Sequence, residues 1–348
     1  MDLVKTSHKR DNMIALLGDT HFGKKGFSEK FYKNKIIFLK KQFFPYLKKY
    51  NINTVIQLGD LFDNRKIIDI KFFQDFIKDF KELLDDWGGN FIVLTGNHDI
   101  YYKNTRDYSV LKILEQILNI NYIEEQTFIE IENKKLGIIP WRIGKEKIKE
   151  EFLNCDYLFG HFEFINFEVV HGIENHYGLD YKKLPFRGKK IFSGHFHLKQ
   201  EKDVVHYIGT PYQLDWNDSG DEKGFYILDL KNDKTELIKN EYSKKFIKIF
   251  LGKTIYGSEK DISIKNLKGN EIKVYLLEDR QENWQFINSL KEENIDFAFI
   301  DKTFKIEIET NEENIKSPKK LLLDNIKDKE LQKVLKELIE EAQRQMKV

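Results

Sequence analysis

The strongest constraint on this chain is a pattern repeated five times, in which a short apolar run ends in glycine and Asp, Asn or His follows at once. In the clearest copy, 91–99, the opening residues Phe-Ile-Val-Leu-Thr are typical of a fully buried strand. A glycine then allows the backbone to turn sharply before three polar side chains. The other four runs end at Gly18, Gly59, Gly160 and Gly194.

Polar side chains therefore follow each predicted strand. They are Asp19 and His21, Asp60, Asn97, His161, and His195 with His197. In open α/β sheets, ligands lie beyond the carboxyl ends of the strands, so we expect these seven side chains to converge on one site. Carboxylate, amide oxygen and imidazole together suit manganese, iron or zinc, and the absence of a thiol argues against a structural zinc site.

The number of candidate ligands favours two ions over one. Seven are too many for one catalytic ion that keeps an open position, but they suit two ions about 3.5–4 Å apart that share one carboxylate. Five of the nine histidines lie in these motifs, namely His21, His98, His161, His195 and His197. A lone histidine after a strand is more often a core or surface residue, but five ordered strand-end coincidences reverse that expectation.

Periodicity predicts the elements between these motifs. Helical spacing of apolar residues covers 28–50, 69–86 and 107–118, and the intervals between Asp19, Asp60 and Asn97 suit strand–helix–strand crossovers. Further predictions are a hairpin of 122–132 with 135–141 around Asn133-Lys134, a helix at 144–153 and a surface loop over the site at 162–188. Strands are predicted at 204–208 and 224–230, with a further strand through Leu237. The fold class is α/β, a sandwich of mixed sheets with helices on the outer faces.

The chain divides into four predicted parts. Residues 1–12 form a polar, flexible leader, although Met13 is an alternative first residue, and 13–242 form the main domain. A small α+β domain covers 243–312, with strands at 246–251 and 271–277, a helix at 283–293 and two short strands within 297–309. Residues 317–348 are amphipathic helix, which either packs on its own domain or docks a partner.

Composition excludes several classes of protein. The net charge is +1, so binding of nucleic acid would need local basic patches. Cys155 is the single cysteine, which rules out an intramolecular disulfide and favours a reducing cytoplasm. No apolar run reaches membrane-spanning length, so no membrane association is expected.

The motifs resemble a known family. Gly18-Asp19-x-His21, Gly59-Asp60-Leu61-Phe62-Asp63, Gly96-Asn97-His98-Asp99, Gly160-His161 and Gly194-His195-Phe196-His197 occur in the order found in calcineurin-like metallophosphoesterases. Ile-Pro-Trp at 139–141 and Tyr-Ile-Gly-Thr-Pro at 207–211 are similar to the SbcD-type nucleases that repair DNA double-strand breaks. The resemblance covers 13–242.

The resemblance implies a role for each motif residue. Asp19, His21 and His197 would hold one ion, Asn97, His161 and His195 the other, and Asp60 would bridge them. His98 would contact the scissile phosphate and assist the leaving group, a task that suits a protonatable imidazole. Because side chains alternate along a strand, Asn97 and His98 should not serve the same ion.

Two acidic residues each have two possible roles. Asp63 stands where many relatives have a histidine linked to exonuclease action, so it either alters the balance of exonuclease and endonuclease activity or caps the following turn. Asp99 is expected to orient His98 or the turn. Both are candidates for contacts behind the ligands or with substrate.

The family implies a manganese-dependent DNA exonuclease and endonuclease, with magnesium as the alternative ion, in the cytoplasm of a bacterial or phage-infected cell. It also implies a homodimer that binds an SMC-like ATPase through 317–348. A small-molecule phosphoesterase or nucleotide phosphodiesterase of the same superfamily is the alternative. A scaffold that has lost its metals is disfavoured because all seven ligand positions are intact.

Overall fold

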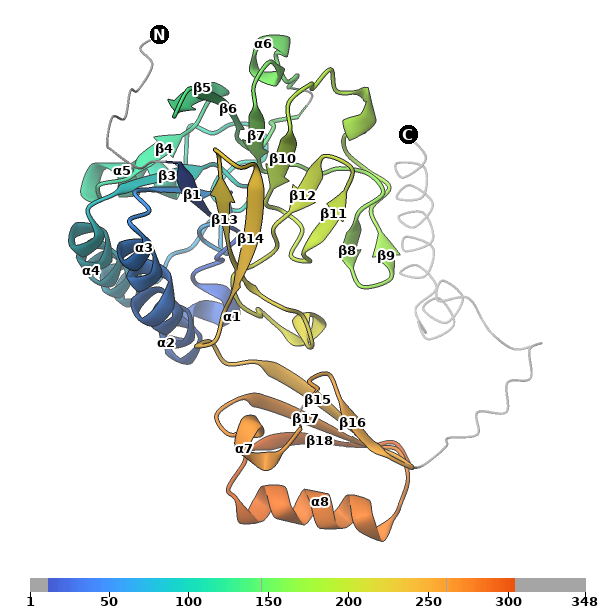
Figure 1. The fold of residues 1–348 in the computed structure, drawn as a ribbon. Coiled ribbons are helices and arrows are strands. Elements are labelled where there is room, and N and C mark those ends of the chain that lie inside the picture. The colour runs from blue at the N-terminus through green and yellow to red at the C-terminus, as the bar shows by residue number, and fades with distance from the viewer. Residues whose placement is uncertain (1–11, 145, 261, 304–348) are drawn as a thin grey trace, which may run out of the picture. The chain divides into compact units, whose positions relative to one another are not determined.

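The computed structural model describes residues 12–144, 146–260 and 262–303. The chain divides into two compact units, Met1–Asp301 and Lys302–Val348. The described elements of the first unit are drawn in colour in Figure 1. The predicted helical segment 317–348, and the predicted leader except its last residue, lie outside the described residues. Within the described part of the chain, no helix combines the length and apolar character needed to cross a membrane.

The first sheet has six strands in the order β14-β13-β1-β2-β3-β4. Their bounds are β1 (Met13–Leu17), β2 (Thr54–Gln57), β3 (Asn90–Leu94), β4 (Asn121–Ile123), β13 (Gly224–Asp229) and β14 (Lys234–Lys239). Strands β1 to β4 run parallel, while β13 pairs antiparallel with β1 and β14 pairs antiparallel with β13. The carboxyl ends of β1, β2 and β3 therefore lie at the same edge.

The second sheet also has six strands, in the order β11-β12-β10-β7-β6-β5. Their bounds are β5 (Thr127–Ile131), β6 (Lys134–Ile139), β7 (Tyr157–Gly160), β10 (Lys190–Ser193), β11 (Gln200–Lys202) and β12 (Val205–Tyr207). Strands β6, β7, β10 and β12 run parallel.

The two sheets share one buried cluster of apolar residues. Ile14 and Leu16 of β1 belong to it together with Phe159 of β7 and Phe192 of β10. Ala15 and Leu17 face the opposite way, into a second cluster with the helices. Because each strand is buried on both faces, its sequence is a continuous apolar run. The predicted fold class, a sandwich of mixed sheets flanked by helices, is confirmed.

Helices cover the outer face of the first sheet (Figure 1). They are the short α1 (Lys24–Phe27), α2 (Glu29–Phe38), a π-helical turn (Leu39–Phe43), α3 (Phe44–Tyr50), α4 (Ile70–Trp87) and α5 (Val110–Ile117). The side chain of Asp69 caps α4 by accepting a hydrogen bond from the Phe72 N–H at 2.8 Å, and Gly88 ends it in the left-handed conformation. The three predicted helices are confirmed to within a few residues.

The predicted strand 122–132 is wrong as a single element. Its first part is β4, which pairs with β3 in the first sheet, and its second part is β5, which pairs with β6 in the second. The hairpin turn is made by Glu132 and Asn133, whose φ values of 50° and 61° suit a two-residue loop between twisted strands. The predicted helix at 144–153 is shorter, α6 (Glu150–Leu153).

The segment 162–188 is not a surface loop. It contains β8 (Glu168–Val170), β9 (Ile173–Glu174) and a 3-10 turn (Tyr181–Lys183). Its aromatic residues form a buried cluster against the second sheet, which includes Phe162, Phe164, Phe167 and Tyr181 with Phe196 and Tyr207. The aromatic residues that suggested a loop in the sequence are therefore part of the hydrophobic core.

Residues 246–301 form a smaller sheet with the order β16-β15-β17-β18. Its elements are β15 (Phe246–Leu251), β16 (Ile255–Gly257), α7 (Ile264–Leu267), β17 (Glu271–Leu276), α8 (Gln281–Glu292) and β18 (Phe297–Asp301). The sheet and α8 enclose their own apolar cluster. Sequence analysis missed β16 and α7, and the domain bounds 243–312 remain a prediction.

Candidate metal centre

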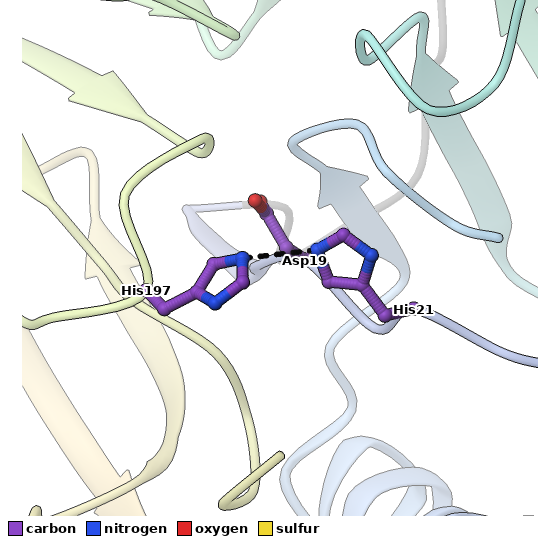
Figure 2. A group of neighbouring side chains, drawn as sticks. All are labelled: Asp19, His21 and His197. Atoms are coloured by element: carbon purple, nitrogen blue, oxygen red, sulfur yellow. Dashed lines mark hydrogen bonds between the residues drawn. The ribbon is translucent and has the colours of Figure 1, made fainter. Parts of the chain in front are cut away.

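Three predicted ligands come together where β1 and β10 end. Asp19, His21 and His197 point toward one another in Figure 2, and their ligand atoms lie within 4.8 Å of one another. Nε2 of His21 is 3.0 Å from Nε2 of His197. Because metal–nitrogen bonds are about 2.1 Å long, two imidazole nitrogens at this separation can share one ion.

A second group forms around Asn97. Its side-chain oxygen Oδ1 lies 2.9 Å from Nε2 of His161 and 2.9 Å from Nδ1 of His195. These residues follow β3, β7 and β10, so both sheets contribute to the group. It holds one neutral oxygen and two ring nitrogens, a donor set that suits a divalent transition metal.

Asp60 lies between the two groups. Its Oδ2 is 3.7 Å from Nε2 of His21 and 3.5 Å from Nε2 of His161. Its other oxygen, Oδ1, accepts a hydrogen bond from the backbone N–H of His98 at 2.7 Å. One carboxylate oxygen is therefore held by the backbone, while the other faces both groups. All seven predicted ligands gather at one edge of the sandwich.

The residues fit a pair of divalent cations. Oδ1 of Asp19 is buried and has no hydrogen-bond partner among the described residues, although Oδ2 accepts from the His195 N–H at 2.9 Å. A buried carboxylate oxygen without a partner is costly unless a cation binds it. Two buried carboxylates together with four histidines and Asn97 supply the mixture of oxygen and nitrogen that such cations prefer.

Burial and charge set the protonation of these groups. Burial, together with the nearby His161, lowers the pKa of His195 to about 3. Burial also lowers the pKa of His197 and of His21. At neutral pH these three imidazoles are uncharged, which is the state in which a histidine binds metal.

His161 behaves differently. Burial alone would lower its pKa, but the charges of Asp60 and Asp19 outweigh burial and raise the pKa to about 9. In the same pairing, burial would raise the pKa of Asp60, while His161 and His21 hold it below the usual range. Nδ1 of His161 donates to the Leu58 carbonyl at 2.7 Å, so Nε2 is the nitrogen left for a metal.

Three of the candidate ligands have left-handed backbone conformations. The φ values of His21, Asp60 and His195 are 45°, 53° and 85°. Non-glycine residues in this region carry conformational strain, which surrounding contacts must offset. Such strain concentrates at functional sites, so its presence here is consistent with one.

Two buried lysines hold the backbone of this strained region. Nζ of Lys35 donates to the carbonyl oxygens of Thr20, at 2.9 Å, and of His21. Nζ of Lys223 donates to the His197 carbonyl at 2.8 Å and pairs with Asp218 at 2.8 Å. Both histidines of the first group are thus fixed through their carbonyls. Sequence reasoning missed both lysines, because isolated lysines carry no local signal of burial.

The strand-end glycines are needed mainly because neighbouring loops approach them closely, and less because the backbone turns there. A Cβ on Gly96 would lie 2.1 Å from the Asp60 nitrogen, and one on Gly194 would lie 2.4 Å from Oδ1 of Asp19. Among the five strand-end glycines, Gly59 is the one with a positive φ, 92°. Glycine is therefore required mainly because loops from neighbouring strands touch at these positions.

Asn97, His98 and Asp99 lie in a turn, so the strand-alternation argument used above for them is wrong. The side chains of Asn97 and His98 nevertheless lie in different surroundings, because Asn97 contacts His161 and His195. The ring of His98 is 5.0 Å from that of His21, and its Nδ1 is 2.6 Å from the Asp63 carbonyl oxygen. With Nδ1 donating to that carbonyl, Nε2 is the nitrogen available to a substrate.

Asp99 binds backbone rather than the His98 ring. Its Oδ2 accepts from the N–H groups of Asp60 and Gly96, both at 2.8 Å, and its Oδ1 accepts from Phe62 at 3.2 Å. It therefore ties the loop after β3 to the loop after β2. Burial and the charge of Asp60 raise the pKa of Asp99 to about 7.

Asp63 contacts two of the histidines. Its carboxylate oxygen Oδ1 is 3.2 Å from Nδ1 of His21, and its carbonyl accepts from His98. The following turn is capped instead by Asn64, whose Oδ1 accepts from the N–H groups of Lys66 and Ile67. Asp63 thus belongs to the histidine cluster rather than to the turn.

Trp141 forms a wall of the second group. Its ring lies 5.0 Å from His195 and 5.8 Å from His161. The guanidinium of Arg106 donates through Nε to the Trp141 carbonyl at 3.0 Å and also pairs with Glu146. In the sequence, only the Ile-Pro-Trp motif at 139–141 indicated Trp141. No sequence motif indicated Arg106.

Comparison with known proteins places this geometry in a family. The model for calcineurin-like phosphoesterases matches residues 13–300. Exonuclease subunit 1 of enterobacteria phage T4 is 32% identical over 261 residues, which cover 72% of this chain and 75% of the relative. DNA double-strand break repair protein Mre11 of Nanoarchaeum equitans is 24% identical over 279 residues, covering 68% and 71%. Among solved structures, GAP50, the anchor in the inner membrane complex of Plasmodium, aligns with 67% of this chain and 90% of its own at 16% identity, with a TM-score of 0.43.

Proposed function

The chain belongs to the calcineurin-like phosphoesterases, a family of hydrolases, and from that premise we propose that it is a metal-dependent DNA nuclease. It would hydrolyse phosphodiester bonds as both exonuclease and endonuclease with two divalent ions, manganese first and magnesium as the alternative. The relatives named as an exonuclease subunit and as Mre11 support DNA as the substrate.

The observation that carries the two-ion proposal is the position of Asp60. One oxygen of its carboxylate faces His21 in the first group and His161 in the second. In this proposal Asp19, His21 and His197 hold one ion, Asn97, His161 and His195 hold the other, and Asp60 binds both. When bound, such ions would supply Lewis-acid chemistry that activates water and neutralises charge on the phosphate oxygens.

His98 is the proposed catalytic residue of the protein itself. Its Nδ1 faces the Asp63 carbonyl, so the ring is oriented and Nε2 is free to approach a phosphate oxygen. There the imidazole would hold the phosphate and donate a proton to the leaving oxygen, a contribution typically worth about 10²–10⁴ in rate.

The test is release of nucleotides from linear duplex DNA in the presence of manganese. We expect His98→Ala to lower the rate by roughly 10²-fold or more while manganese binding is retained. Asp60→Ala should lose both activity and metal. The exposed His176 provides the matched control, and His176→Ala should cleave like wild type. Undiminished cleavage by His98→Ala or Asp60→Ala would remove those residues from the mechanism.

A small-molecule phosphoesterase is the second candidate within the family. It predicts efficient hydrolysis of small aryl phosphates and nucleotides, together with indifference to DNA. The same manganese-loaded protein should therefore be assayed on an aryl phosphate diester and on duplex DNA. Preference for the small ester by kcat/KM would favour this alternative and contradict the nuclease proposal.

The ATPase partner is proposed from the resemblance alone. The segment 317–348, which would dock on an SMC-like ATPase, lies outside the described residues. Truncation before Ser317 should abolish co-purification with an SMC-like ATPase encoded nearby while leaving the metal-dependent activity of the remaining chain. Retained co-purification would refute this segment as the docking site.

A homodimer is the further proposal, and exposed apolar side chains support it. Ile70 at the start of α4 is 77% exposed, and Ile113 and Ile117 of α5 are also exposed. Exposed apolar groups of this kind commonly mark protein interfaces. Sedimentation of wild type and of Ile70→Asp and Ile113→Asp variants tests the proposal, because a dimer formed through α4 and α5 should dissociate. An unchanged sedimentation coefficient in both variants would exclude this surface.

A further inference from the structure

Helix α8 covers one face of the small sheet (Figure 1). Three stacked aromatic rings lie on the opposite face. Tyr256, Phe250 and Tyr275 lie opposite one another on β16, β15 and β17. The centroids of Tyr256 and Phe250 are 5.1 Å apart with their planes 17° from parallel, and those of Phe250 and Tyr275 are 4.9 Å apart at 13°. We call these three residues the aromatic row.

The aromatic row lies outside the apolar core of the small domain, which is on the other face of the same strands. Ile247, Ile249 and Leu251 of β15 point into the apolar cluster beneath α8. Phe250 alternates with them and is half-buried, and Tyr256 is 51% exposed. Packing between neighbouring strands explains why these rings lie next to one another. It does not explain why the edge strand carries a tyrosine, Tyr256, whose ring is half exposed.

Positive charge flanks the aromatic row. Lys248 and Lys273 are register partners on β15 and β17, two residues along from Phe250 and Tyr275, and they share the same face. Glu271 is the acidic strand residue of this face, and its carboxylate is paired with Lys30 at 2.6 Å. Aromatic rings beside lysines are the combination that holds single-stranded nucleic acid, by base stacking and by contact with phosphates.

We propose that this face binds an unpaired DNA strand, with a base continuing the stack at Tyr256 and a phosphate at Lys248, while Nζ of Lys273 lies 4.1 Å from the centre of the Trp216 ring. β16 is the edge strand, so no neighbouring strand in the described part of the chain continues the row beyond Tyr256. Stacking tolerates any base, so binding would not depend on sequence. The inference rests on the proposed nuclease function and narrows its substrate to DNA that exposes a single-stranded end.

The experiment measures binding of a fluorescein-labelled oligothymidylate to the full chain by anisotropy. EDTA is present, so the metal centre does not cleave the probe. Tyr256→Ala should raise Kd about 5- to 100-fold, as expected for the loss of one base–aromatic stack. Tyr256→Phe keeps the ring and should bind like wild type. Tyr50, which is 50% exposed on α3, gives the matched control Tyr50→Ala, which should leave Kd unchanged.

Three results would overturn the proposal. One is wild-type affinity in Tyr256→Ala, and another is an equal loss in Tyr50→Ala. The third is wild-type affinity in Tyr256→Leu, which would mean that the face needs apolar area and serves a protein partner instead. Thermal unfolding of each variant verifies that the small domain is still folded.

Salt dependence tests the lysines separately. Each phosphate contact to a single strand contributes about 0.7 to the slope of log Kd against log salt concentration. Lys248→Gln should lower that slope by about this amount, and an unchanged slope would exclude Lys248 from the contact. Cleavage of blunt duplex DNA with manganese is scored in parallel. If the wild-type protein binds the oligonucleotide but cleaves no DNA, the nuclease proposal is refuted, whereas the proposed single-strand binding surface is retained.

Discussion

The carboxylate of Asp99 accepts a hydrogen bond from the backbone N–H of Asp60 at 2.8 Å, although the two residues are 39 positions apart in the chain. The same oxygen, Oδ2, accepts from Gly96 at 2.8 Å. One side chain therefore joins the loops that carry Asp60 and Asn97. Because Asp60 has a φ of 53°, this bond also helps to hold a strained ligand in place.

Replacing Asp99 by Asn should destabilise the protein and weaken metal binding. An amide has one acceptor oxygen in place of two, so at least one buried N–H group among those of Asp60, Phe62 and Gly96 loses its partner. We expect the free energy of unfolding to fall by about 1–3 kcal/mol. Denaturant unfolding of the metal-free protein measures this, and a change within 0.5 kcal/mol, on the order of an ordinary surface substitution, would contradict it.

Metal binding should release a proton from His161. In the metal-free protein its pKa is about 9, so the ring is charged at pH 7 and Nε2 must lose its proton before it can bind a cation. The affinity of the second ion should therefore rise with pH and level off above about 9. Calorimetry at pH 7 in buffers of different ionisation enthalpy counts the protons released. We expect about one for this ion and none in His161→Asn.

The same raised pKa has a consequence for stability without metal. The folded-state pKa of His161 lies above its usual value of 6.5, so the folded protein binds the proton more tightly than the unfolded chain. The ion pair with Asp60 thus contributes stability that is complete below pH 6.5 and is lost as pH rises through about 9. Unfolding in EDTA should show this loss, and it should be absent in His161→Asn.

Removing the buried Lys223 should weaken the first ion selectively. In Lys223→Met the His197 carbonyl loses its charged donor and keeps the longer bond from the Thr210 N–H at 3.3 Å, so His197 is held less firmly through its backbone. Loss of contacts behind a ligand typically lowers metal affinity about 10- to 100-fold. Titration with manganese should show one weakened and one unchanged site. Lys199→Met is the control, because Lys199 is exposed and pairs with Glu222 on the surface.

Asp63→His should shift activity toward exonuclease. The carboxylate of Asp63 lies 3.2 Å from His21. The family resemblance implies a histidine linked to exonuclease action at this position. A second imidazole beside His98 would add a proton donor near the leaving group, so we expect the ratio of exonuclease to endonuclease rate to rise roughly tenfold or more. Nucleotide release from linear duplex is compared with nicking of circular single strands. A ratio equal to that of wild type would show that Asp63 acts only in packing.

The sequence alone determined the order of the strands along the chain and the residues at their ends. Buried parallel strands need continuous apolar runs, and their carboxyl ends share one edge, so Asp19, Asp60 and Asn97 could be assigned to one site before any coordinates were known. The helix at 69–86 was equally predictable, because a regular apolar stripe and a glycine stop are local signals.

Only the tertiary structure decided what surrounds those ligands. Lys35 and Lys223 lie 14 and 26 residues from the histidines whose carbonyls they bind, and no local pattern links them. The composition of 162–188 predicted a surface loop, but its aromatic residues are buried against the second sheet. The glycines are required by contacts between separate loops, such as Gly96 against Asp60. Periodicity records which face of an element is buried, whereas contacts between distant elements depend on how the sheets pack.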